Sequence, residues 1–502
     1  MEQTYPRFTP DMKKTHKILI PNMAPVQFRI LAASMENHGY QVELLGNCGE
    51  RVAELGLKYV HNDTCYPALL VIGQFLDALD SGKYDLDHTA LIITQTGGGC
   101  RASNYIFLLR KALEKAGYGN IPVLSLNFSG LEKDSSMPMD LKFMRQALAA
   151  IYYGDLLMTL RAQTQPYELE AGAAERLQNK WLDILCDEVR HDKGYSGREM
   201  KAVMPKIAAE FAAIPVRRVP KVKVGVVGEI YVKYSPLGNN ELEKFLASQD
   251  CEVNLPGLMG FVQYCAYNMA ETVRLYGGSL VEKTAAEAAL ALIAGMEKVI
   301  IKTLKDAGYH APMPFSELIK LPEQSHTIGM GCKMGEGWLL TAEMLELVRS
   351  GYENIVCAQP FGCLPNHIVG KGIIRKVKEY YPQANVCPID FDAGASPVNQ
   401  ENRIRLMLAL AREGGNANET GKEADRSGRC AGSGAGSVSG RYARYTPHQR
   451  QKRRDGNAGH VCRHILHGGR HPLDHMDEPW ERIHHFENRR RLDAGRLRRL
   501  PA

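Results

Sequence analysis

The sequence predicts an α/β fold with two parallel-sheet lobes of the Rossmann-like (flavodoxin-like) type, a helical connection between them and a disordered C-terminal tail. In the first part of the chain, short apolar runs alternate with segments of helical periodicity, which is typical of β-α-β units and parallel sheets. The same alternation starts again at Val222, after a stretch with few strand signals. The predicted boundaries are 13–140 for the first lobe, 141–220 for the connection, 221–412 for the second lobe and 413–502 for the tail.

In the first lobe, each apolar run is bounded by Gly, Pro or polar turn residues, which fits buried strands. We expect strands at 16–21, 42–45, 90–94 and 121–126. We expect helices at 26–39, 68–76 and 105–115. Because parallel strands end at one edge of a sheet, the loops that follow them should carry the residues that bind ligands.

The second lobe repeats this organisation with longer helical segments. An apolar strand begins at Val222 and leads into Glu229, and further strands are expected at 354–357 and 384–390. Helices are expected from Glu241, within 256–320, and over 370–380 and 399–412. The last of these helices should close the ordered part of the chain.

Five cysteines lie in short turns rich in Gly and Pro, and these turns come from both lobes. They are Cys65, Cys100, Cys332, Cys357 and Cys363. A thiolate in such a turn, at a strand end and before a helix, meets backbone N–H groups and the positive end of a helix dipole. Both lower a cysteine pKa and suit a metal-bound sulfur. We therefore expect the five thiols to converge on one shared site.

Composition excludes several classes of protein. The chain has 502 residues, 44% of them hydrophobic and 24% charged, as in soluble globular proteins. No run of 18 apolar residues predicts a membrane span, and the polar N-terminus lacks the apolar core of a signal peptide, so a cytoplasmic location is expected. Twelve cysteines in a reducing compartment favour metal ligands or buried thiols over disulfides.

The net charge of +6 is concentrated at the C-terminal end. Residues 1–412 hold 44 Lys and Arg against 45 Asp and Glu, so this part gives no electrostatic reason to expect nucleic-acid binding. Residues 413–502 hold 16 Arg but only Lys422 and Lys452, and they lack apolar periodicity. Two interpretations stay open for this tail: a disordered basic arm, or an out-of-frame coding stretch that has been translated.

The cysteine turns and their neighbours resemble motifs of the 2-hydroxyacyl-CoA dehydratase family in the broad sense. The closest members are the activase-related, double-cubane-cluster proteins and the C-terminal part of the large activase-fused relatives. The resemblance covers about residues 13–412 and is specific only when its motifs are taken together. They are the segments 62–67, 96–105, 227–236, 331–338 and 357–367.

This resemblance implies an iron–sulfur cluster, either a 4Fe-4S cubane or a sulfide-bridged double cubane. It implies that a partner, an ATP-dependent activase of the actin-like fold, supplies low-potential electrons. The chain has no Gly-x-x-x-x-Gly-Lys-Ser/Thr loop, so we expect it to bind no nucleotide itself. A homo- or heterodimer is expected, with an acyl-CoA or another small molecule as substrate.

If a cluster is present, the glycines and cations near the cysteines have a role. Gly98, Gly99, Gly331 and Gly362 would let backbone amides approach the cluster, because glycine has no Cβ to obstruct them. Lys333 and Arg101 would offset the negative charge of the cluster, since burying that charge unpaired would be costly.

Two other interpretations of the five cysteines are possible: buried apolar thiols and a zinc site. Buried apolar thiols are common, and a zinc site is disfavoured because no Cys-x-x-Cys pair occurs. Cys265 lies in an apolar helical pattern and fits a core position better than a ligand, but it is the reserve candidate for a sixth thiolate. The remaining cysteines outside the tail lack the Gly/Pro context and are expected to be structural: Cys48, Cys186, Cys251 and Cys387.

Three further side chains are candidates for proton chemistry. Glu229 follows a strand and a glycine, and either proton transfer to substrate or a helix N-cap would explain it. His367 follows the last cysteine turn and is either a proton or hydrogen-bond donor, or a helix-capping histidine. Glu336 lies beside the Cys332 turn and is expected to support a ligand.

Two functions follow from these observations. The first is a redox enzyme, a dehydratase or an ATP-coupled reductase, in which a cluster between two lobes passes an electron to a small substrate. The second is a non-catalytic iron–sulfur electron carrier or accessory subunit of an activase system. A substrate cavity that reaches the cysteine site would favour the first function.

Overall fold

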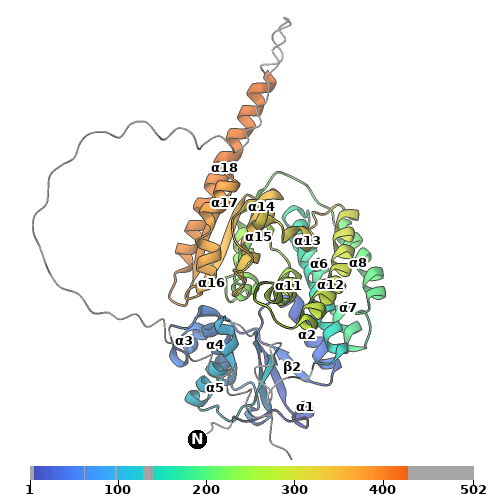
Figure 1. Ribbon diagram of the computed structural model, residues 1–502, viewed down its shortest axis with the longest axis vertical. Helices are drawn as coiled ribbons and strands as arrows, with labels where there is room; N and C mark the ends of the chain where they lie inside the picture. Colours follow the sequence, from blue (N-terminus) through green and yellow to red (C-terminus); the bar gives the residue numbers. More distant parts are fainter. Residues whose placement is uncertain (1–4, 62, 97–98, 128–136, 138, 428–502) are drawn as a thin grey trace, which may run out of the picture. The chain divides into compact units, whose positions relative to one another are not determined.

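The computed structural model describes residues 5–61, 63–96, 99–127, 137 and 139–427. It contains two four-stranded sheets, all of whose strands are parallel, flanked by helices (Figure 1). The predicted α/β fold class is therefore confirmed. Both sheets have the same order of strands, with the first strand of each lobe beside its second and third.

The first sheet has the order β2-β1-β3-β4. Its strands are β1 (Lys17–Ile20), β2 (Gln41–Leu44), β3 (Thr89–Gln95) and β4 (Val123–Asn127). Its helices are α1 (Met12–Thr15), α2 (Pro25–Asn37), α3 (Glu50–Tyr59), α4 (Tyr66–Asp80) and α5 (Tyr105–Ala116). The chain turns back between β1 and β3, so the loops after these two strands border the crevice where parallel sheets bind ligands.

Helices α3 and α4 cross at two glycines, Gly56 and Gly73. A Cβ at Gly73 would lie 1.9 Å from the backbone oxygen of Val52, and one at Gly56 would lie 2.2 Å from that of Leu69. Neither gap leaves room for any side chain. The close crossing lets α4, which is buried on almost every face, sit in the core of the first lobe.

The second sheet has the order β6-β5-β7-β8. Its strands are β5 (Val222–Gly228), β6 (Cys251–Asn254), β7 (Asn354–Pro360) and β8 (Asn385–Phe391). The helices around it are α9 (Ile230–Tyr234), α10 (Leu242–Ser248), α13 (Phe315–Leu318), α14 (Leu321–Ser325), α15 (Gly337–Arg349), α16 (Leu364–Asn366), α17 (Ile374–Tyr380) and α18 (Pro397–Ser427). Strand β6 was not predicted, because its sequence, Cys-Glu-Val-Asn, has a single β-branched residue and contains Glu and Asn, which are depleted in strands.

Side chains of β7 alternate between two helical layers. Ile355 and Cys357 pack in the same apolar cluster as α15, whereas Val356 and Ala358 belong to the cluster that contains residues of α18. This alternation follows from the two-residue period of a strand. The alternation therefore determines which helical layer each side chain of β7 contacts.

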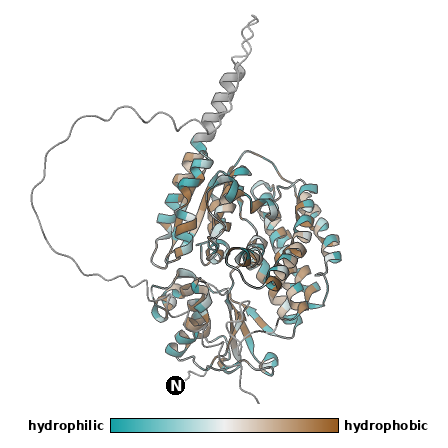
Figure 2. Ribbon diagram, viewed as in Figure 1, coloured by the Kyte–Doolittle hydropathy of each residue, from teal (hydrophilic) through white to brown (hydrophobic). Residues whose placement is uncertain are grey.

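The helical connection consists of α6 (Leu141–Thr164), α7 (Ala173–Arg190) and α8 (Gly197–Ala212). Ser196 and Glu199 form a capping box at the start of α8. These helices share one apolar core with α11 (Leu258–Tyr276) and α12 (Leu280–Asp306), so helices from both sides of the predicted boundary at 220 form this layer. Figure 2 shows brown, hydrophobic residues on these helices where they face each other.

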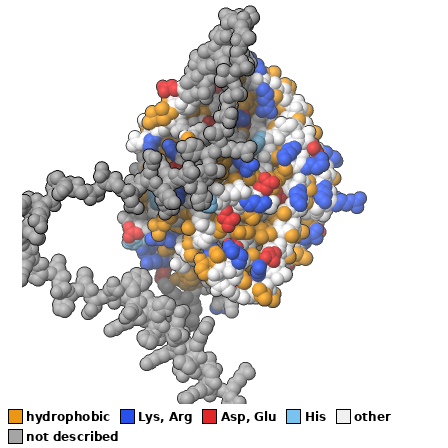
Figure 3. Space-filling model, turned by 45° about the horizontal axis from the view of Figure 1, so that its top comes forward, with side chains coloured by type: hydrophobic (Ala, Val, Ile, Leu, Met, Phe, Trp, Pro, Cys, Tyr) orange, Lys and Arg blue, Asp and Glu red, His pale blue; other side chains and the backbone are white. Residues whose placement is uncertain are grey.

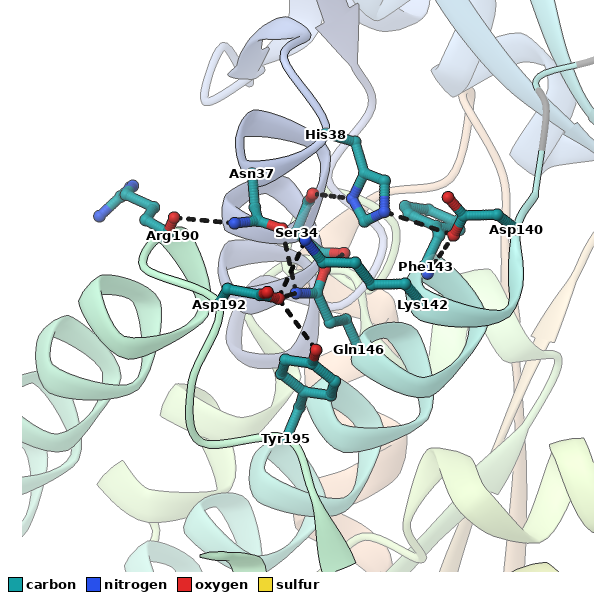
Figure 4. Close-up of polar contacts among 10 residues, drawn as sticks. All are labelled: Ser34, Asn37, His38, Asp140, Lys142, Phe143, Gln146, Arg190, Asp192 and Tyr195. Atoms are coloured by element: carbon teal, nitrogen blue, oxygen red, sulfur yellow. Dashed lines mark hydrogen bonds and ion pairs between the residues drawn. The ribbon is translucent and has the colours of Figure 1, made fainter.

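A polar network attaches α2 of the first lobe to this helical layer (Figure 4). The Ser34 hydroxyl donates a hydrogen bond to Gln146 Oε1 at 2.8 Å, and both residues are fully buried. The Lys142 ammonium lies 2.9 Å from Asp192 Oδ1, an ion pair that lowers the pKa of that carboxyl. Because these contacts join residues that are far apart in the chain, they fix α2 against α6 and α6 against the loop after α7.

Asp155 of α6 holds the first turn of α11. Its carboxylate accepts hydrogen bonds from Leu258 N at 3.0 Å, Met259 N at 2.8 Å and Gln27 Nε2 at 2.9 Å. Burial nevertheless raises the pKa of Asp155 to about 6, because the cost of desolvating the charge outweighs these bonds.

The raised pKa predicts a pH effect on stability. The folded-state pKa lies above the unfolded value of 3.8, so the stability that protonation contributes is complete below pH 3.8 and is lost as pH rises through about 6. This difference between the folded and unfolded pKa of Asp155 corresponds to about 3 kcal/mol of folding free energy. Urea unfolding measures the free energy of unfolding of the wild type and of Asp155→Asn. Between pH 4 and pH 7 the wild type should lose stability relative to the variant, which cannot ionise at this position. A difference that stays constant over this range would contradict the prediction.

The last helix departs from its predicted end. Helix α18 continues to Ser427, fifteen residues beyond the boundary drawn at 412 from composition. The rest of the predicted tail, 428–502, lies outside the described residues.

No helix in the described part of the chain has the length and apolarity needed to cross a membrane. On the face drawn in Figure 3, acidic and basic side chains are interspersed with apolar ones. This mixture matches the near-neutral balance of residues 1–412.

Candidate functional site

Turns from the two lobes meet at the carboxyl ends of their strands. The backbone N–H of Tyr66 donates to the carbonyl oxygen of Phe361 at 3.2 Å, which joins the Cys65 turn to the Cys363 turn. A Cβ at Gly99 would lie 2.7 Å from Met334 Sδ, so the turn before Cys100 touches the turn after Cys332. The crevices of the two sheets therefore face one site.

The two cysteine turns of the second lobe also touch each other. The Gly335 Cβ position lies 3.2 Å from Pro365 Cβ. Asn366 Nδ2 donates to Glu336 Oε2 at 2.6 Å and lies 3.3 Å from Cys363 Sγ. The sequence analysis did not select Asn366. Its place three residues after Cys363, one turn along a helix, was the signal that could have found it.

Cys65 is enclosed by both lobes. Its sulfur lies 2.8 Å from the hydroxyl of Tyr105, the first residue of α5. Gly362 approaches its backbone, since a Cβ there would lie 3.5 Å from Cys65 Cα. Gly362 has φ +77°, a left-handed conformation that favours glycine, so this residue is needed for the turn itself.

Cys332 and Cys265 are both exposed. The core position that the sequence favoured for Cys265 is therefore wrong. Desolvation, then the charge of Glu336, raises the pKa of the Cys265 thiol to about 12.

Cys357 lies in a different environment from the other four cysteines. It is fully buried in the core between β7 and α15, where Gln359 Nε2 lies 3.6 Å from its sulfur and the Cβ position of Gly370 lies 3.1 Å from it. Burial raises its pKa, and the acidic groups that contribute are Asp390 and Glu343, not the carboxyls of the cysteine turns. This placement matches the alternative of a buried apolar thiol.

Two carboxyl groups lie among the turns. Glu229 caps α9, where its Oε2 accepts a hydrogen bond from Val232 N at 2.9 Å, so the N-cap alternative is confirmed. Glu336 accepts a bond from Ile230 N at 3.0 Å as well as from Asn366. Burial raises the pKa of both groups, and the charge of Glu336 raises that of Glu229 further. Such a pair favours a protonated state at neutral pH.

The expectation of lowered thiol pKa values is wrong for Cys357, as described above, and for three further cysteines. Burial raises the pKa of the Cys65 thiol and outweighs its hydrogen bond with Tyr105, which lowers it. Burial also raises the pKa of Cys100 to about 11. Burial, then the charge of Glu336, raises the pKa of Cys363 strongly. Desolvation and two nearby carboxyls outweigh the backbone N–H groups on which the expectation rested. These thiols would release protons on binding a metal.

The other predicted residues lie at the edge of the site or point away from it. His367 Nδ1 lies 3.9 Å from Asp390 Oδ1, and no described contact joins its ring to a cysteine. Lys333 bonds to the Thr272 hydroxyl and lies over the ring of Tyr276, 5.1 Å from its centroid. Arg101 donates to the carbonyl oxygen of Asp63.

The predicted glycines have mixed outcomes. A Cβ at Gly331 would meet only the Tyr276 hydroxyl, at 3.6 Å, so space alone does not demand glycine there. Gly99, by contrast, makes the close approach between lobes described above, and the left-handed backbone of Gly362 favours glycine although its Cβ position has room. Gly98 lies outside the described residues.

An apolar cavity of about 130 Å³, which was not predicted from the sequence, reaches this site from the first lobe. Its walls come from the ends of β1 and β3 and from α2, α4 and α5. Glu229 and Tyr105 line it, which places a carboxyl and the hydroxyl partner of Cys65 beside an otherwise hydrophobic space. Such a cavity suits an uncharged part of a small molecule.

No protein-family model matches the sequence, and no curated protein matches it. Within the described ranges, no three His, Cys, Asp or Glu side chains are grouped closely enough to hold a single metal ion. A cluster places less stringent demands on these distances than a single ion, because its thiolates bind different iron atoms.

Proposed function

We propose that the protein is an iron–sulfur redox enzyme of the 2-hydroxyacyl-CoA dehydratase type. It would receive low-potential electrons from a separate ATP-dependent activase and act on a small substrate, a 2-hydroxyacyl-CoA or another reducible molecule. The observation that carries this proposal is the meeting of four cysteine turns, two from each lobe, at the facing crevices of two parallel sheets.

The proposed ligands are Cys65, Cys100, Cys332 and Cys363, with Cys265 as a further thiol for a bridged double cubane. Thiolates are the usual protein ligands of iron–sulfur clusters, and the cluster supplies one-electron transfer when bound. We leave Cys357 out of this set because its sulfur is packed in the core behind β7.

The carboxyl pair fits the same proposal. An anionic cluster beside two ionised carboxylates would be repelled, whereas protonated carboxyls would not oppose it. The pKa of Glu229, raised to about 8, favours its protonated form at neutral pH, and burial shifts the pKa of Glu336 in the same direction. Glu229 would hold a proton beside the apolar cavity, within reach of a substrate there.

The cavity is also the reason to prefer an enzyme over an electron carrier. A carrier needs only contact with its electron donor and acceptor, whereas Glu229 and Tyr105 line a space large enough for part of a small molecule. A proton-holding carboxyl at that space has a use in catalysis and none in simple electron storage.

Anaerobic reconstitution tests the ligand set. The wild type should bind iron and sulfide in equal amounts for a cubane, or with a small excess of sulfide for a bridged double cubane, and give an electron paramagnetic resonance signal on reduction with dithionite. Cys332→Ser and Cys363→Ser should lose most of both, because each removes a thiolate from the shared site. Cys48→Ser, a change at an exposed cysteine, is the matched control and should bind iron like the wild type.

Cys357→Ala separates the two proposed ligand sets. If the thiol only fills the core, this variant should keep its iron and lose some thermal stability. If the Cys357→Ala variant lost the cluster but kept its fold, Cys357 would be one of the cluster ligands. A wild type that takes up no iron and sulfide, or a Cys332→Ser variant with full iron content, would refute the proposal.

A further inference from the structure

The apolar cavity of the first lobe has the size of one small ring. Its volume is about 130 Å³, and an apolar protein cavity of about 150 Å³ can hold benzene. A group of about six carbon atoms therefore fits inside it, whereas two fused rings exceed it. The volume thus limits the size of the substrate group that can enter.

The walls of this cavity suit an aromatic ring better than a saturated one. Besides Tyr105, three aromatic side chains and three methionines line it, together with aliphatic residues. Aromatic rings attract one another edge to face, and a thioether sulfur makes favourable contacts with ring edges. The aromatic and methionine residues in question are Phe28, Phe143, Tyr231, Met23, Met35 and Met137.

The same walls disfavour a charged group. Among the described residues that line the cavity, Glu229 is the only carboxylic acid, and none is Lys, Arg or His. An anionic group would be buried there without a cation to pair with it, which is costly. An ordered water molecule needs about two to four polar partners, and the apolar walls do not supply them.

The polar end of the cavity lies toward the cysteine turns. Thr94 and Thr96 line the cavity, are exposed, and lie at the carboxyl end of β3, just before the turn of Cys100. Tyr105 also lines it, and its hydroxyl lies 2.8 Å from Cys65 Sγ. A molecule whose ring fills the apolar part therefore has its other end directed to the cysteine turns.

We propose that this cavity is a specificity pocket that holds one uncharged aromatic ring of the substrate. The substrate class is thus narrowed to small molecules in which a single aryl group is joined to the reacting part. That the ring belongs to a substrate rests on the proposed redox function. That the cavity binds such a ring follows from its own size and walls.

Three probes of matched shape test the proposal on the full-length protein: benzamide, benzoate and cyclohexanecarboxamide. Benzamide should bind, and benzoate should bind about tenfold more weakly or worse, because its charge finds no cation. Cyclohexanecarboxamide should bind about threefold more weakly or worse, because it loses the contacts between rings and with sulfur. NMR of labelled methionine methyl groups measures the binding, and the signals of Met35 and Met137 should shift.

Two variants and one control locate the binding. Ala32→Leu fills the cavity from α2 and should weaken benzamide binding by about tenfold or more without lowering the melting temperature. Leu126→Phe fills it from β4, and it covers the case in which the first variant fails to fold. Ala288→Leu makes the first change at an exposed position of α12 and should bind benzamide like the wild type.

Several results would overturn the proposal. Unchanged benzamide binding in both filled variants, or no shift at Met35 and Met137, would place the ring elsewhere. Benzoate or cyclohexanecarboxamide binding as tightly as benzamide would refute the selectivity. Iron uptake is a separate measurement. Benzamide binding without iron uptake would refute the redox function and leave the pocket, whereas iron uptake without benzamide binding would refute the pocket alone.

Discussion

Gly73→Ala should lower the free energy of unfolding by about 3 kcal/mol or more. The added Cβ would lie 1.9 Å from the backbone oxygen of Val52 and 2.9 Å from the nitrogen of Gly56. Both atoms belong to the backbone of α3, so no rotamer change can relieve the overlap, and the two helices must separate. Because α4 lies in the core of the first lobe, the separation would expose apolar side chains. Urea unfolding followed by circular dichroism measures the effect.

Gly295→Ala is the matched control for this experiment. Gly295 lies inside α12, and no atom approaches its Cβ position within 4 Å. The same substitution there should stabilise the protein by about 0.5–1 kcal/mol, because alanine has the higher helix propensity. If both variants changed stability by the same amount, the α3–α4 crossing would not be the constraint described here.

Lys233→Met should cost about 3–5 kcal/mol of folding free energy. Lys233 Nζ lies 2.9 Å from both carboxylate oxygens of Glu343, and the two side chains are 5% and 7% exposed. Burial already raises the pKa of Glu343, and the ammonium opposes that effect. Without the lysine, Glu343 must remain charged and unpaired or take up a proton, and either is costly.

A double variant and a surface pair serve as controls for this ion pair. Lys233→Met with Glu343→Leu should recover most of the loss, because it removes both buried charges together. Lys302→Met breaks the exposed ion pair with Asp306 in α12 and should change stability by less than about 0.5 kcal/mol. A double variant as unstable as Lys233→Met alone would contradict this explanation.

Periodicity was sufficient to predict most of the fold. The runs at 90–94 and 354–357 are strands of the two sheets because each is a short β-branched segment between turn residues. Periodicity gave no sign of the crossing at Gly56 and Gly73, because a glycine inside a helical pattern has no partner visible in sequence.

The site was predicted by turn chemistry and only in part. Gly/Pro context identified the turns of Cys65, Cys100, Cys332 and Cys363, and these turns meet. Cys357 shares this context, but the two-residue period of β7 places its thiol in the apolar cluster with α15, and the Cys357→Ala variant tests it as a ligand. Raised thiol pKa values could not be foreseen, since burial and the positions of Glu229 and Glu336 are properties of the tertiary structure.

The hydrogen bond between Tyr66 N and Phe361 O has a consequence for sequence divergence. Both atoms belong to the main chain, so the bond is independent of which side chains occupy these positions. Of the common amino acids, only proline at 66 would remove the donor. Homologues could therefore exchange both aromatic residues and still inherit the same alignment of the two lobes across the cysteine turns.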